Sequence, residues 1–120
     1  MAHDYRLKRV YDPFHKDDGF RVLVDRLWPR GVAKAKAHID LWLKDIAPSD
    51  DFRHRFHDHA ERWKAFVEAY EKELKSPEAK AAAALLKEKN HAGTVTLLYA
   101  SRDEAHNNAV ALKDWLERAD

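Results

Sequence analysis

The sequence predicts a single small α/β domain over residues 1–120, with a short, mostly parallel sheet of about three strands and surrounding helices in two or three layers. Apolar runs rich in β-branched residues alternate with segments of helical periodicity, which is the order found in layered α/β folds. The length is sufficient for one domain with a core of its own. Four Trp, four Tyr and five Phe residues can fill that core, although 36% of the residues are charged.

Three runs are predicted to form strands, at residues 7–11, 20–24 and 94–99. The second run contains VLV, and its consecutive apolar residues indicate that both faces of this strand are covered. Only about eight residues separate the first two strands, which favours a hairpin for that pair. The long connection from Val24 to Thr94 instead allows a right-handed parallel crossover.

Helical periodicity begins near Lys34, after the second strand. An amphipathic helix is predicted from four apolar residues with the spacing i, i+3, i+4 and i+7, namely Ile39, Trp42, Leu43 and Ile46. Pro48 is expected to end this helix. Ser49 is then expected to cap a short helix that runs through Phe52 and Phe56.

Two further helices are predicted before the third strand. The first has an apolar side formed by Trp63, Phe66, Val67, Tyr70 and Leu74. The second is predicted to begin at Ser76, an N-cap residue followed by proline, and to end near residues 90–93. Trp42 and Trp63 lie on predicted apolar sides and are expected in the core, whereas Trp28 belongs to no such pattern and is expected to be partly exposed.

The last helix is predicted to begin directly after the third strand, because Ser101 and Glu104 have the spacing of a capping box. Its core-facing side is expected at Ala105, Asn108, Ala109, Leu112 and Leu116. A helix start at this point would place backbone N–H groups near Arg102, where they attract anions.

Composition and charge argue against several classes of function. The net charge of +1 gives no global attraction for polyanions, so any nucleic-acid binding must rest on a local patch. The absence of cysteine excludes a thiol nucleophile and fits a reducing compartment. No apolar stretch is long enough to span a membrane, and the amino terminus has no signal-like apolar region. We therefore expect a cytoplasmic protein without a membrane partner, and neither a metal nor a cofactor is implied.

Charged residues follow two of the predicted strands at the point where each strand ends. Residues 25–31 read DRLWPRG, and residues 99–103 read YASRD. Ligands of open α/β sheets bind beyond the carboxyl ends of parallel strands, so these two segments are expected to share one edge of the sheet. The candidate residues in and after them are Asp25, Arg26, Trp28, Arg30, Gly31, Tyr99, Ser101, Arg102, Asp103, Asn107 and Asn108.

The residue types at this predicted edge favour recognition of an anion. Arg26, Arg30 and Arg102 carry planar guanidinium groups that can bind a carboxylate or phosphate. Asp25 or Asp103 can serve as a general base or can orient the arginines. The structural alternative is that the Asp–Arg pairs are ion pairs that stabilise the fold and that Pro-Arg-Gly only forms a turn.

Two other charged segments are expected to be solvated. His54, His57 and His59 are residue types that bind zinc or nickel, but their spacing fits no closed motif, and a histidine-rich loop without metal is expected. The basic run KAKAH, which begins at Lys34, is expected to be an exposed helix face rather than a nucleic-acid contact.

Five motifs together resemble the YeaO-like family, a bacterial and archaeal group within a superfamily of domains of unknown function. They are LKRVYDP, DGFRVLVDRLWPRGVAK, WLKDIAPS, RW..F...Y..EL and GTVTLLYASRDEAHNNAVAL, and they cover nearly the whole chain. The family's motif positions fall on Arg9, Tyr11, Asp12, Asp25, Arg26, Trp28, Pro29, Arg30, Gly31, Tyr99, Arg102, Asp103, Asn107 and Asn108. The resemblance thus implies a site at the same edge and adds Arg9 and Tyr11 to it, but it names no substrate.

The chain departs from this family's pattern in the segment RHRFHDHAERW, where the family has Gly-His-Asp and this chain has His57, Asp58 and His59. Some members of the family are described as MarR-type transcriptional regulators. This sequence shows no winged-helix pattern, so the resemblance gives little support to that role.

Three functions fit these observations. The first is an enzyme acting on a small anionic or nucleotide-like substrate, with the arginines holding the anion, Trp28 stacking on the substrate, and Asp25 or Asp103 as the base. The second is a non-catalytic module that senses a ligand or docks a partner, and the third is a nucleic-acid-associated regulator. A buried carboxylate without partners would favour catalysis, whereas fully paired carboxylates would favour binding or a structural role. The oligomeric state is left open.

Overall fold

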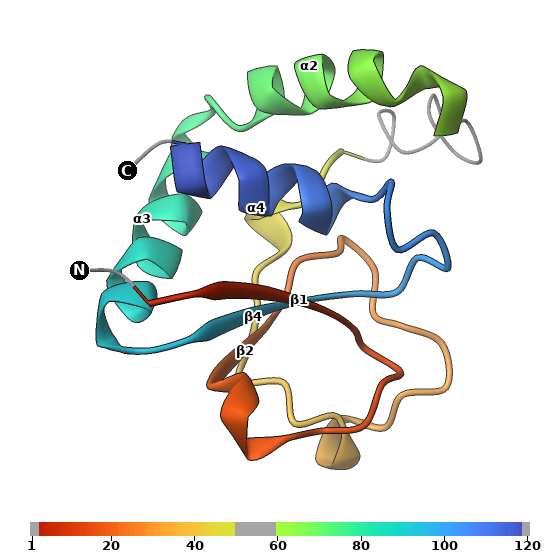
Figure 1. Cartoon of the computed structure of the whole chain (residues 1–120), viewed down its shortest axis with the longest axis vertical. Helices are drawn as coiled ribbons and strands as arrows, with labels where there is room; N and C mark the ends of the chain where they lie inside the picture. The colour runs from red at the N-terminus through yellow and green to blue at the C-terminus, as the bar shows by residue number, and fades with distance from the viewer. Residues whose placement is uncertain (1–2, 50–59, 119–120) are drawn as a thin grey trace.

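The computed structural model describes residues 3–49 and 60–118, and within them four strands form one sheet (Figure 1). In the sheet order β1-β4-β2-β3 the strands are Tyr5–Arg9, Val95–Tyr99, Phe20–Leu23 and Leu41–Trp42. Every neighbouring pair is parallel. The predicted α/β class with a parallel sheet is therefore confirmed, and the sheet has one strand more than expected.

The predicted hairpin of the first two strands is wrong, because β4 lies between β1 and β2 and pairs with both. The chain instead returns beneath the sheet through a short 3-10 helix, Lys16–Asp18 (Figure 1). Gly19 then brings the start of β2 so close to β4 that an added Cβ atom would lie 2.2 Å from the Thr94 carbonyl oxygen. Its φ of 66° also lies in the left-handed region, which glycine adopts readily. Glycine at this position thus allows β2 to enter parallel to β4.

Three α-helices lie on one face of the sheet (Figure 1): α2 (Trp63–Glu73), α3 (Pro77–Ala92) and α4 (Asn108–Arg118). The predicted apolar side of α2 is confirmed, since Tyr70 and the adjacent Leu74 are buried in the core. The predicted start of α3 is also confirmed, because the Ser76 side chain accepts a hydrogen bond from the Ala79 N–H.

The helix predicted around Ile39–Ile46 is wrong, because Leu41–Trp42 forms the edge strand β3 between two 3-10 turns. Pairing with β2 stabilises the extended backbone, and the Leu43 N–H donates to the Leu23 carbonyl at 2.9 Å. The four apolar residues whose spacing predicted one side of a helix instead pack on the two opposite faces of the sheet. Ile39 and Trp42 contact the cluster beneath the sheet, and Leu43 and Ile46 belong to the core under the helices. The short helix predicted after Ser49 lies outside the described residues.

The last helix begins at Asn108, seven residues later than the predicted cap at Ser101. Two later side chains provide the turn and the cap instead. Asp103 Oδ1 accepts hydrogen bonds from the N–H groups of residues 105 and 106, and Asn107 Oδ1 accepts one from Val110. Ala105 is consequently exposed, Asn108 is half-buried, and the core-facing residues of α4 are Ala109, Leu112 and Leu116 as predicted.

Alternate residues of the strands point to the two faces of the sheet and form two apolar clusters. The larger cluster lies under the helices, and the smaller one lies beneath the sheet around Val10, Leu23 and Leu98. Trp63 packs against the first cluster and Trp42 against the second, but both are half-buried rather than fully buried as expected for core residues. Loops thus cover the face that the helices leave open.

The helix α4 runs back across the sheet, from the edge where the strands end to the edge where they begin (Figure 1). Its first residue is held at the carboxyl edge, because Asn108 Nδ2 donates to the Val24 carbonyl at 2.9 Å. Its end at Arg118 and the start of β1 at Tyr5 therefore lie on the same side of the molecule. In the described part of the chain, no helix is both long enough and apolar enough to cross a membrane.

Candidate functional site

The loops that follow β1, β2 and β4 meet at the carboxyl edge of the sheet. The residue pattern predicts this for the loops after β2 and β4, whereas for the loop after β1 only the family resemblance implies it. Arg9, the last residue of β1, donates from Nε to the Ser101 carbonyl at 2.9 Å and from Nη2 to the Ala100 carbonyl at 3.1 Å. The Ala100 N–H in turn donates to Asp25 Oδ2 at 2.8 Å. Side chains from two loops therefore hold the residues that follow β4.

The three predicted anion-binding arginines have different surroundings. Arg26 donates to the carbonyls of Pro48 at 3.0 Å and Ala47 at 3.3 Å, so its guanidinium group anchors the segment after β3. Arg30 and Arg102 are exposed. Within residues 3–49 and 60–118, neither of these two side chains forms a hydrogen bond or an ion pair, and no such contact joins the three arginines.

Both carboxylates predicted as bases accept hydrogen bonds from backbone N–H groups. Asp25 accepts from Ala100 as described, and Asp103 Oδ1 accepts from Ala105 at 3.0 Å and from His106 at 2.9 Å. Asp103 Oδ2 also lies 3.2 Å from His106 Nδ1. The bond from the His106 backbone, followed by those from Ala105 and the imidazole, lowers the pKa of Asp103 below its ordinary value. His106 was not predicted from the sequence, although its spacing of three from Asp103 was a usable signal.

Trp28 is partly exposed, as predicted, but its indole takes part in the fold. Nε1 donates to the Val32 carbonyl at 2.7 Å and closes the turn after β2. The ring packs edge-on against Trp42 at 5.3 Å between centroids, and the Lys34 ammonium lies 5.7 Å from the Trp28 ring centre. Trp28 therefore stabilises the turn after β2, independently of any contact with a ligand.

The remaining candidates from the β4–α4 loop are also engaged. Tyr99 is 3% exposed, and burial, reinforced by the charges of Glu104 and Asp12, raises the pKa of its phenol. Asn107 Nδ2 donates to the Asp103 carbonyl, and Ser101 Oγ accepts from the Asp103 N–H. These three side chains order the connection from β4 to α4.

A groove with a cavity volume of about 570 Å³ lies between the loop after β1 and the loop after β2. We call it the edge groove, and it is lined by Val10, Tyr11, Asp12, Pro13, Phe14, Arg21, Gly31, Val32, Ala33, Lys36, Ala37 and His38. Two of these, Tyr11 and Gly31, are predicted site residues. The others were missed, although an aromatic residue within the polar run DPFHKDDG was a signal for Phe14.

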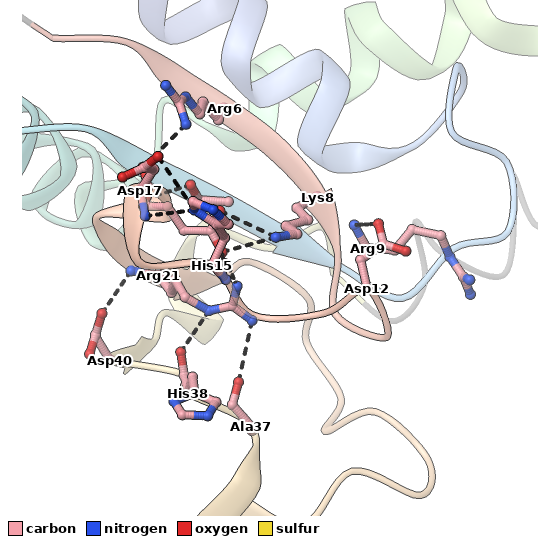
Figure 2. Close-up of polar contacts among 12 residues, drawn as sticks. Arg6, Lys8, Arg9, Asp12, His15, Asp17, Arg21, Ala37, His38 and Asp40 are labelled. Atoms are coloured by element: carbon pink, nitrogen blue, oxygen red, sulfur yellow. Dashed lines mark hydrogen bonds and ion pairs between the residues drawn. The ribbon is translucent and has the colours of Figure 1, made fainter.

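The buried side chain of Arg21 contacts residues from both walls of the edge groove, and its bonds to one wall are drawn in Figure 2. It is 2% exposed, and it donates to the His38 carbonyl at 2.8 Å and to the Ala37 carbonyl at 3.4 Å. On the other wall it contacts the Phe14 ring, with 5.3 Å between the guanidinium carbon and the ring centre. It also forms an ion pair with Asp18. The shape of the groove therefore depends on one guanidinium group from the middle of the sheet.

Asp18 lies between two cations. Its carboxylate pairs with Arg21 and with the Lys8 ammonium at 3.1 Å, and it accepts the His15 N–H. Burial raises the pKa of Asp18, but these three partners outweigh burial and hold it below its ordinary value. Two positive charges thus share one negative charge in this cluster, and a second carboxylate, that of Asp40, accepts the Arg21 N–H at 2.8 Å.

Aromatic rings form much of the exposed wall. Phe14 stacks on His38 with 4.1 Å between ring centroids, and Tyr11 lies under the Arg9 guanidinium group at 5.0 Å. The Tyr11 hydroxyl donates to the Arg30 carbonyl at 2.9 Å, which ties the two loops together. Gly31 has a φ of 73°, and an added Cβ atom there would meet nothing within 4 Å. The groove is open at this point.

No group of three or more potential metal ligands occurs among the residues that the structure describes. The cluster of His54, His57 and His59 lies outside them, so its expected lack of metal stays a prediction.

Comparison with known families gives a match over almost the entire chain. The inactive DUF488-N3 subclade, a grouping of domains of unknown function, matches residues 4–119. The chain belongs to this subclade.

Curated relatives agree with the membership in the DUF488-N3 subclade. The uncharacterized protein YeaO of Escherichia coli K12 is 42% identical over 111 residues, which span 91% of this chain and 93% of YeaO. The uncharacterized protein Rv3073c of Mycobacterium tuberculosis H37Rv is 39% identical over 111 residues and 92% of either chain. The resemblance to the YeaO-like family is confirmed. No solved structure gives a significant match.

In this member of the DUF488-N3 subclade, most motif side chains bond to the backbone. The bonded residues are Arg9, Tyr11, Asp12, Asp25, Arg26, Trp28, Asp103, Asn107 and Asn108. The motif therefore builds the carboxyl edge, and the exposed groups beside it are the arginines at 30 and 102 and the wall of the edge groove.

Proposed function

We propose that this DUF488-N3 protein is a non-catalytic module that binds a small anionic ligand in the edge groove. The observation that carries the proposal is the pairing of both candidate bases. Asp25 and Asp103 each accept backbone N–H bonds, and at Asp103 such bonds lower the pKa of the carboxylate and make it a weaker base. The description of the subclade as inactive supports the same conclusion.

Charge supports an anion as the ligand. Lys36 lines the groove, is exposed, and forms no ion pair with any described residue. Arg21 also lines the groove, and its guanidinium group shares the Asp18 carboxylate with Lys8. Arg30 is exposed beside the opening, where its carbonyl accepts the Tyr11 hydroxyl. An anion would therefore be attracted to the Lys36 side of the groove, whereas the Asp12 carboxylate repels it from the other wall.

Isothermal titration with a panel of nucleotides, sugar phosphates and carboxylic acids tests this proposal. At least one anion should bind, and Lys36→Gln should weaken it about tenfold, as expected when one charge-assisted hydrogen bond is lost. Lys80→Gln, which removes an exposed lysine on α3, is the matched control and should leave binding unchanged. Absence of binding by every anion, or equal loss in both variants, would contradict the proposal.

One observation favours the alternative of an enzyme acting on a small anionic or nucleotide-like substrate. His106 Nδ1 faces Asp103 Oδ2, an arrangement that orients an imidazole as a general base. The same ligand panel, followed by product analysis, separates the two functions. Turnover that is lost in His106→Gln while ligand affinity is retained would establish the enzyme. Unchanged ligand after long incubation supports the binding module.

A further inference from the structure

The edge groove has the size and the lining of a small-ligand pocket. Its cavity volume of about 570 Å³ lies within the range of roughly 300–1,000 Å³ that such pockets occupy. The lining combines apolar side chains such as Val10 and Val32, aromatic rings, one carboxylate and one lysine. The question is which anion requires all of these groups.

The aromatic side chains indicate that part of the ligand is a flat ring. Tyr11 is 46% exposed and Phe14 is 48% exposed, so both keep a large apolar surface in water at the wall of the groove. Hydrogen bonding of the Tyr11 hydroxyl and stacking of Phe14 on His38 hold the two rings in place. Fixed, exposed aromatic rings are platforms on which nucleic-acid bases stack, and a base would use the ring surface that Arg9 leaves open on Tyr11 and that His38 and Arg21 leave open on Phe14.

The polar groups in the groove have opposite charges and come from different walls. Asp12, from the loop after β1, accepts the Arg9 N–H at 3.3 Å through one oxygen, and its carboxylate can accept further bonds from hydroxyl or amino groups. Lys36, from the loop after β2, offers an ammonium group to a phosphate. Because Asp12 repels an anion, the phosphate is expected beside Lys36 and the hydroxyl or amino groups beside Asp12.

We infer that the ligand of the edge groove is a nucleoside monophosphate, with its base on the aromatic wall and its phosphate at Lys36. This inference rests on the proposed function and adds the class of the ligand. Inorganic phosphate would use only the lysine, and a sugar phosphate would use the lysine and Asp12 but not the rings. A nucleoside without phosphate would use only the rings and Asp12. A nucleoside monophosphate contacts all three.

Titration of the full chain with the four common nucleoside monophosphates, adenosine, ribose 5-phosphate and inorganic phosphate tests the inference. At least one nucleoside monophosphate should bind about tenfold more tightly than adenosine and about tenfold more tightly than ribose 5-phosphate. Equal affinity for ribose 5-phosphate would overturn the inference and leave the proposed anion-binding function intact. Lack of binding by every anion would overturn both.

Variants assign the binding to the groove. Tyr11→Leu should weaken the nucleoside monophosphate about tenfold and leave ribose 5-phosphate within about twofold, whereas Tyr11→Phe keeps the ring, loses only the hydroxyl bond to Arg30, and should weaken the nucleoside monophosphate less than Tyr11→Leu does. Lys36→Gln should weaken both phosphorylated ligands but not adenosine. Circular dichroism of each variant verifies that it is folded. Affinity that is insensitive to Tyr11→Leu and Lys36→Gln would overturn the inference, as would a single-stranded oligonucleotide that binds far more tightly than any mononucleotide.

Discussion

Single arginine side chains bind backbone carbonyls at several points of this chain. Arg9 and Arg26 each bond to two carbonyls, and Arg21 bonds to two carbonyls and to Asp18. A guanidinium group can make several bonds in a fixed plane, which suits it to join loops that have no regular pairing of their own. Of the arginines that the sequence predicted as ligand-binding residues, Arg9 and Arg26 are therefore structural.

Asp18→Asn is expected to destabilise the protein by about 3–5 kcal/mol, because it leaves the buried Arg21 without its counter-charge. Urea unfolding at pH 7 measures the change. Asp17→Asn, at the exposed neighbouring position, is the control and should cost no more than about 0.5 kcal/mol. Similar small effects of both substitutions would show that the buried pair contributes little.

The effect of Asp18→Asn should depend on pH. The pKa of Asp18 is lowered in the folded protein from its ordinary value of 3.8, so ionised Asp18 stabilises the fold at pH values above 3.8. This contribution is lost as the pH falls through the lower folded-state pKa. Unfolding free energies of the two proteins should therefore differ most near neutral pH and converge below pH 3.8. A difference that stays constant from pH 7 down to pH 3 would contradict this account.

Among the secondary-structure elements, those with continuous local signals were predictable. The apolar side of α2 and the Ser76–Pro77 start of α3 depend on neighbouring residues, and both are confirmed. Residues 39–46 show why spacing alone can mislead. Their apolar side chains serve two clusters on opposite faces of the sheet, and pairing of β3 with β2 depends on a strand far away in the sequence.

The position of the candidate site could be predicted from the sequence. Which of its side chains are available to contact a ligand could not be predicted. The carboxyl edge follows from a parallel sheet, and the loops after β1, β2 and β4 do meet there. Which side chains are available depends on partners distant in the sequence. Arg9 binds carbonyls more than ninety positions away, and Arg26 binds the backbone of residues 47 and 48. The edge groove was missed because Phe14 and His38 stack only after the chain has crossed beneath the sheet.

The start of α4 gives a prediction at the scale of one element. Asn107→Ala should cost about 1 kcal/mol, within a range of about 0.5–2 kcal/mol, because Oδ1 accepts the Val110 N–H at the helix start. Thermal and urea unfolding measure the loss. Ser101→Ala tests the position that the sequence suggested as the cap, and it should change stability by less than about 0.5 kcal/mol. A larger loss for Ser101→Ala than for Asn107→Ala would reverse this assignment.

At the scale of the whole molecule, the sheet joins segments from opposite ends of the chain. β4, from the last quarter of the sequence, lies between β1 and β2 from the first. The parallel arrangement requires the chain to return beneath the sheet before β2, and the close approach of Gly19 to Thr94 is part of that return. The same return path forms one wall of the edge groove.

Gly19→Ala and Gly31→Ala compare two glycines with positive φ in different surroundings. Gly31→Ala should cost about 1–2 kcal/mol, because only the backbone conformation is unfavourable and the space around it is open. Gly19→Ala adds an overlap of the new methyl group with the Thr94 backbone and should cost about 1–3 kcal/mol more. Urea unfolding of both variants checks the difference. Equal losses of stability in the two variants would mean that β2 and β4 can move apart at Gly19 without a cost in free energy.

The direction of α4 has a practical consequence for attaching this protein to a surface or to another domain. Because α4 runs back from the carboxyl edge, Arg118 and Tyr5 lie on the side of the molecule where the strands begin (Figure 1). The loops after β1 and β2, which form the edge groove, extend from the opposite side. A tether joined to the end of α4 or to the start of β1 would thus begin at the edge of the sheet away from the points where these loops leave it, so a sensor built on this chain could be immobilised from either end.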